Sequence, residues 1–102
     1  MPVVPDTRKE AEIRFRVLKT IEAHQDKCPT STIREGALHG NDSAFERLLG
    51  QSGILRRTEM VLVTTVGDVD YYGRTERGKN MQEWLLWAIS IDKHTGGEGW
   101  TR

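Results

Sequence analysis

The sequence contains few of the residues that metal sites and redox sites are built from. It holds a single cysteine, Cys28, among 102 residues. One cysteine excludes an internal disulfide, and the neighbours Lys27 and Pro29 complete neither a metal-binding nor a redox motif. We therefore expect Cys28 to be a plain, exposed thiol.

Long apolar runs and a signal pattern are also missing. No stretch approaches the roughly 20 apolar residues that a membrane helix needs. The first ten residues, MPVVPDTRKE, lack the charged-then-apolar pattern of an export signal. We expect no membrane partner, and the cytoplasm is the default compartment.

The residue patterns that would support catalysis are absent. The three histidines, His24, His39 and His94, are not at metal-ligand spacing from one another or from Cys28. No glycine-rich loop follows a strand and opens a helix, and no nucleophile has a nearby base. The prediction is a protein without catalytic residues, metal or cofactor.

A surplus of positive charge is lacking as well. Fifteen Lys and Arg residues balance fifteen Asp and Glu residues. The whole chain therefore has no net attraction to a polyanion, which argues against strong nonspecific nucleic-acid binding. Neutral net charge does not exclude a local basic face, because nucleic-acid binding also depends on how the charge is distributed.

The residues that are present predict one small domain at 7–91, between an extended tail at 1–6 and a flexible tail at 92–102. Helix-forming residues begin near Thr7. One side of this first helix carries apolar residues at helical spacing, and two more flank it. These are Ala11, Phe15, Leu18 and Ile21, with Ile13 and Val17 beside them.

Two shorter helices should follow. One is predicted near 31–38, where Thr32 and Glu35 have capping-box spacing, and the other begins where Ser43 and Glu46 repeat it. The turn residues at 39–41 separate them. The later helix should end near Gly50 to Gly53.

The period then changes from helix to strand. The run MVLVTTV favours a strand, Gly67 and Asp68 a turn, and Val69 to Gly73 a return strand, giving a hairpin over 58–73. A last helix should span 75–91, with Thr75 as its cap. The predicted fold class is α+β in the order ααα-ββ-α with a long C-terminal helix, which is the order of a winged helix-turn-helix domain.

Two local segments carry a family resemblance over roughly Arg14 to Ile91. GILRR at 53–57 resembles the exit from the recognition helix of winged helix-turn-helix transcriptional regulators. YGRTERGK at 72–79 is similar to their junction between wing and last helix, although Arg74 stands where an apolar residue is usual. Among subgroups, the small archaeal dimeric winged-helix proteins are most similar; MarR-like and PadR-like regulators remain alternatives.

The resemblance implies where DNA would bind. The helix after the 39–41 turn would enter the major groove, with Arg47 as its leading contact, and basic residues at the base of the wing would grip phosphate. The candidates are Ser31, Thr32, Arg34, Asn41, Ser43, Arg47, Gln51, Arg56, Arg57, Arg74 and Arg77.

Other interpretations of these residues stay open. The helix face can be capped and solvated, since Asp42 and Glu46 repel phosphate, and the wing-base arginines can pair with surface carboxylates. The wing tip carries Asp68 and Asp70, which suits a minor groove poorly.

The last helix also indicates self-association. Trp84, Trp87 and Ile91 form a second apolar row, which we expect a second copy to cover. The alternative is that the tryptophans pack on Phe15 and Val17 of the same chain.

These observations predict a homodimer that binds a palindromic site on double-stranded DNA and regulates transcription. The competing hypothesis is a winged-helix protein-interaction module that does not bind DNA, which the neutral charge and acidic tip favour.

Overall fold

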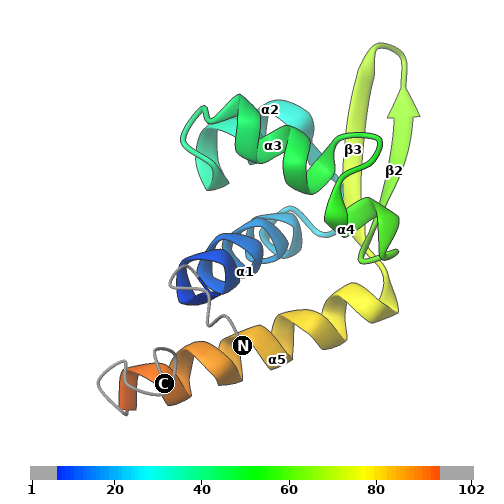
Figure 1. Cartoon of the computed structure of the whole chain (residues 1–102). Helices are drawn as coiled ribbons and strands as arrows, with labels where there is room; N and C mark the ends of the chain where they lie inside the picture. The colour runs from blue at the N-terminus through cyan, green and yellow to red at the C-terminus, as the bar shows by residue number, and fades with distance from the viewer. Residues whose placement is uncertain (1–6, 95–102) are drawn as a thin grey trace.

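The computed structural model describes residues 7–94, and side chains within 9–90. The expected tail at 1–6 therefore lies outside the described residues, as does 95–102 of the expected tail at 92–102. The chain forms an α+β fold in which helices pack beside a three-stranded antiparallel sheet (Figure 1). Its hairpin projects from the helical body.

The first helix, α1 (Thr7–Ala23), supplies much of the core. Ala11, Leu18 and Ile21 are buried as expected. Val17 is completely buried, whereas Phe15 is only partly buried. The buried face of α1 is therefore turned slightly toward Val17, which leaves Phe15 at its margin.

The second helical segment has two geometries. It starts as α2 (Thr30–Thr32) and continues as the π-helix η1 (Ile33–Ala37). The Leu38 N–H donates to the Ile33 carbonyl at 3.1 Å, a wide turn that returns Leu38 to the buried side. The helix was correctly expected here, but its capping box was wrong, because Pro29 precedes the first turn and no side chain caps it.

The third helix, α3 (Asp42–Leu49), begins with a different cap from the one expected. Asn41, not Ser43, holds the N-cap position, where its Oδ1 accepts from the Ala44 N–H at 3.0 Å. Asparagine caps a helix as well as serine does, and it is the residue with extended backbone at this point. The end of the helix at Leu49 agrees with the expectation.

Two short elements were not expected. A helix, α4 (Ile54–Arg57), precedes the hairpin, and a two-residue strand, β1 (Cys28–Pro29), pairs with the middle of the sheet. Neither is long enough to show a hydrophobic period. Proline also argues against a strand unless the strand lies at a sheet edge, as β1 does.

The hairpin consists of β2 (Val61–Val66) and β3 (Val69–Arg74), within one to three residues of the expected bounds. Gly67 adopts φ 64° in the turn, which only glycine does without strain. The strand order is β1-β3-β2, so β2 is an edge strand. Tyr72 of β3 is buried and meets the Phe45 ring edge-on at 6.0 Å, which joins the sheet to α3.

The last helix, α5 (Glu76–His94), packs along α1 (Figure 1). Its expected cap is confirmed: Thr75 Oγ1 accepts from the Gly78 N–H at 3.0 Å. The helix extends to His94, three residues beyond the expected end near Ile91, so residues 92–94 of the expected tail are helical. Leu85, Ala88 and Ile89 are buried on its inner side.

Candidate nucleic-acid interface

Four of the candidate contacts lie on α3 or at its two ends, but two of them are engaged within the molecule. Ser43 and Gln51 are exposed. Asn41 uses its side-chain oxygen to cap the helix. The Arg47 Nη1 donates to Glu10 Oε2 of α1 at 2.6 Å, so the leading candidate is held by a carboxylate.

The environment of Glu10 keeps that pairing charged. Burial alone would raise its pKa, but hydrogen bonds from Arg47 and Arg14 outweigh burial and lower the pKa below its ordinary value. Glu10 is therefore ionised at neutral pH. A phosphate would have to compete with this carboxylate for the Arg47 guanidinium.

The start of the second helical segment offers little free charge. Ser31 is exposed and Thr32 is half-buried. Arg34 stacks over the Phe45 ring, and its Nε lies 3.3 Å from an Asp42 oxygen. That is an ion-pair distance without hydrogen-bond alignment, so the buried N–H has no hydrogen-bond partner.

Arg74 is a structural residue rather than a phosphate contact. Its Nε and Nη2 donate to both oxygens of Asp26 at 2.6 and 3.0 Å, and its Nη1 donates to Gln82 at 3.0 Å. Only 12% of the side chain is exposed. The expectation that Arg74 joins a cationic surface is corrected by this pairing. Hydrogen bonding to Arg74 also lowers the Asp26 pKa.

The remaining wing-base arginines form a distinct group, which we call the α4 arginine cluster: Arg56, Arg57 and Arg77. Arg77 Nη1 donates to the Thr58 carbonyl at 3.0 Å, which brings the first turn of α5 against the end of α4. Arg57 is exposed and Arg56 half-buried. Within the described residues, none of the three is in an ion pair, so the alternative in which Arg56 and Arg57 pair with surface carboxylates is not seen there.

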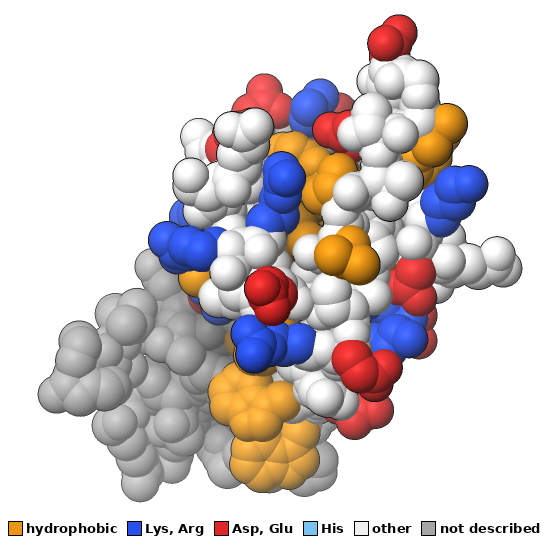
Figure 2. All heavy atoms as spheres, turned by 90° about the vertical axis from the view of Figure 1, so that its right-hand side faces the viewer, with side chains coloured by type: hydrophobic (Ala, Val, Ile, Leu, Met, Phe, Trp, Pro, Cys, Tyr) orange, Lys and Arg blue, Asp and Glu red, His pale blue; other side chains and the backbone are white. Residues whose placement is uncertain are grey.

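The tip of the hairpin is acidic. Asp68 is exposed in the turn, and Asp70 accepts from Thr65 Oγ1 at 2.6 Å. Figure 2 shows acidic atoms at the far end of the hairpin, and basic, acidic and apolar side chains interspersed below it. The positive charge available to a polyanion is thus confined to small groups.

More than half of the surface of each α5 tryptophan is exposed. Trp84 is 56% and Trp87 60% exposed, so the alternative of packing against Phe15 and Val17 was wrong. The side chain of Ile91 lies outside the described ones. Leu86, which sequence reasoning missed, is also exposed, on the flank of α5 that faces α1.

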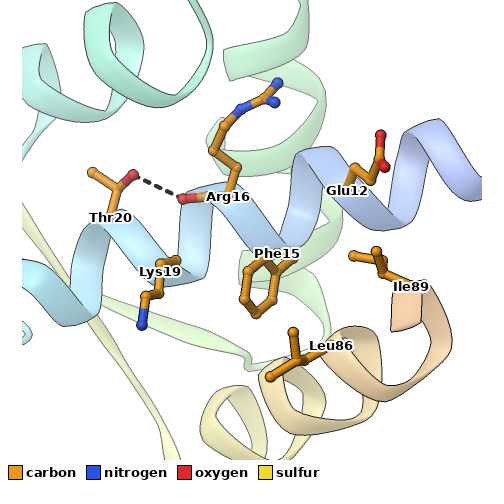
Figure 3. Close-up of a pocket in the computed structure, with 7 residues that line it drawn as sticks. All are labelled: Glu12, Phe15, Arg16, Lys19, Thr20, Leu86 and Ile89. Atoms are coloured by element: carbon orange, nitrogen blue, oxygen red, sulfur yellow. Dashed lines mark hydrogen bonds between the residues drawn. The ribbon is translucent and has the colours of Figure 1, made fainter. Parts of the chain in front are cut away.

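A shallow groove of about 470 Å³ runs between α1 and α5. In Figure 3, Phe15 of α1 and Leu86 of α5 point toward one another, while the Arg16 side chain points away from them. Arg16 Nε donates to the Ala37 carbonyl at 2.8 Å, and Thr20 Oγ1 donates to the Arg16 carbonyl at 2.8 Å. The polar groups at its edge are thus occupied, and the groove is mainly apolar.

The described residues contain no group of three or more His, Cys, Asp or Glu side chains that could hold a metal ion. Cys28 is buried, not exposed as expected, because β1 places it against the sheet. Burial raises its pKa to about 11. Between residues 7 and 94, no helix has the length and apolarity needed to cross a bilayer.

Comparison with family models, curated proteins and solved structures finds no match for this chain.

Proposed function

We propose that this protein is a winged helix-turn-helix module that binds double-stranded DNA as a homodimer and regulates transcription. The observation that supports this most is the α4 arginine cluster at the base of a hairpin that follows a helix-turn-helix. In this arrangement α3 approaches the major groove, and the cluster contacts the phosphates beside it.

The charges support a revised set of contacts. None of Arg56, Arg57 and Arg77 is in an ion pair with a described carboxylate. Arg47 is held by Glu10, and Arg74 by Asp26. The cluster therefore replaces Arg47 as the leading contact, with Ser43 on α3 and Gln51 in the turn after it as polar contacts. A dimer presents two such sets to a palindromic site.

The test is a salt titration of binding to duplex DNA. Each phosphate contact contributes about 0.9 to the slope of log K against log salt. The Arg56→Ala/Arg57→Ala/Arg77→Ala variant should therefore lower the slope by about 2 to 3 and weaken binding at least 30-fold at low salt, measured by fluorescence anisotropy. Lys19→Ala, which removes an exposed cation from α1, is the control and should bind as the wild type does.

Absence of detectable binding by the wild-type protein to random duplexes at low ionic strength would reject the DNA proposal. If the triple variant bound DNA as tightly as the wild type, the α4 arginine cluster would not be the phosphate contact.

A second candidate function is protein binding without DNA. One observation favours it: the hairpin has an acidic tip together with exposed apolar side chains, namely Leu62, Val66 and Val69. Such a surface suits a protein partner better than a minor groove. The salt titration separates the two functions, because this one predicts no binding to DNA.

A further inference from the structure

Three of the exposed large apolar side chains lie on one face of the hairpin. Leu62 is 64%, Val66 55% and Val69 40% exposed. Val66 and Val69 are directly opposite each other, and Thr64 of β2 is opposite Tyr71 on the same face. None of these residues belongs to the α5 tryptophan row.

The β2 strand lies at the edge of the sheet and has no protection against pairing. Within the described chain it pairs only with β3, in a continuous register without a bulge. Every second residue of β2 therefore directs its N–H and C=O groups away from the sheet. Natural edge strands are usually guarded by charges, proline or bulges, and the run VLVTTV contains none of these.

We propose that β2 pairs antiparallel with β2 of a second copy of this chain, which joins the two sheets at their edges. A two-fold axis through Thr64 places Leu62 opposite Val66 of the partner copy on both sides of the axis. The alternate side chains of a strand share one face, so all four apolar side chains fall on the same face. The strand is thus complementary to itself in this register.

Charge complementarity supports a second copy as the occupant. In this register Asp68 at the hairpin tip of one copy lies opposite Met60 of the other. Met60 follows α4, which carries Arg56 and Arg57, with Glu59 beside it in the sequence. The acidic tip, which suits DNA poorly, is accounted for by this pairing.

The interface is small, so the association should be weak. One strand pair buries less than the roughly 1,200 Å² that stable complexes bury at the least. We expect a dissociation constant on the order of 100 µM. The β2 amides that point away from β3 should show slower hydrogen exchange as the protein concentration rises. The exchange rates of other exposed amides should not change.

The experiment uses the full chain with Trp84→Ala and Trp87→Ala, so that α5 does not contribute. Thr64→Lys places two like charges directly opposite each other at the axis and should weaken self-association at least tenfold in sedimentation equilibrium. Thr64→Glu should do the same. An equimolar mixture of the two variants should recover association to within about threefold of the parent, because opposite charges then meet.

Val69→Lys is the matched control. It puts the same charge on the same face, but on β3, away from the paired edge, and should weaken association less than threefold. Equal loss with Val69→Lys would show face-to-face stacking instead. Unchanged association of Thr64→Lys, or a mixture that does not recover, would overturn the proposal. DNA binding is measured separately and does not enter this result.

Discussion

At the scale of single residues, the ion pairs within the chain determine which arginines are available to bind phosphate. The sequence shows a row of arginines around the hairpin and predicts their placement at its base. It does not show that Arg74 pairs with Asp26, which is distant in sequence, or that Arg47 pairs with Glu10. Both pairings depend on how α1 packs against the rest of the chain, and no local pattern encodes that packing.

The Asp26–Arg74 pair should govern stability in acid. Its hydrogen bonds hold the Asp26 pKa below the ordinary value, so the pair stabilises the fold above that ordinary value and loses its contribution as pH falls through the lowered pKa. Arg74→Ala should cost about 2 kcal/mol at pH 7, measured by urea unfolding. Asp26→Asn should also destabilise the protein at pH 7. It should make the free energy of unfolding fall less steeply between about pH 5 and 2.

Asp42→Asn provides a control at an exposed carboxylate and should change stability by less than about 0.5 kcal/mol. If Asp26→Asn retained the wild-type acid dependence, another carboxylate would be responsible.

At the scale of elements, the long periodic segments were predictable and the short ones were not. The spacing of apolar residues predicted α1, α3 and α5, and the β-branched run predicted β2. The π-turn of η1 was not predictable, because it comes from burying Leu38 together with Ile33 rather than from any residue preference. β1 and α4 were not predictable either, because two and four residues are too short to show a hydrophobic period.

The junction between hairpin and α5 supplies a test at this scale. A Cβ on Gly78 would meet the Met60 carbonyl oxygen, so the helix can approach the chain there only with glycine. Alanine ordinarily stabilises a helix by up to about 1 kcal/mol relative to glycine. We expect Gly78→Ala to destabilise instead, by about 2 kcal/mol, seen as a fall in Tm of roughly 8 to 15 °C by circular dichroism.

Asn80→Ala, at an exposed position two residues along the same helix, should leave Tm unchanged or raise it slightly. A gain in Tm from Gly78→Ala would show that α5 and Met60 are not in close contact.

At the scale of the whole molecule, α5 has two apolar surfaces. One packs on α1, and the other, with Trp84 and Trp87, faces outward. A second copy is the simplest cover for such a stripe. The sequence predicted the stripe from its spacing, but its exposure follows only from which side of α5 meets α1.

Sedimentation equilibrium at about 10 µM should give a dimer for the wild type and the monomer mass of 11.6 kDa for Trp84→Ala/Trp87→Ala, since two large apolar side chains are lost from each copy. Leu86→Ala removes an exposed apolar residue from the other flank of α5 and should leave the dimer intact. A double variant that stays dimeric would place this interface elsewhere.

The packing of α1 against α5 also has a consequence for synthesis. Leu18 and Ile21 of α1 are fully buried, and α1 packs along α5, which the ribosome makes later. The elements between them can form local contacts earlier, but the core closes only when α5 packs on α1. A nascent chain of this protein therefore leaves the side of α1 that packs on α5 uncovered until translation has passed α5.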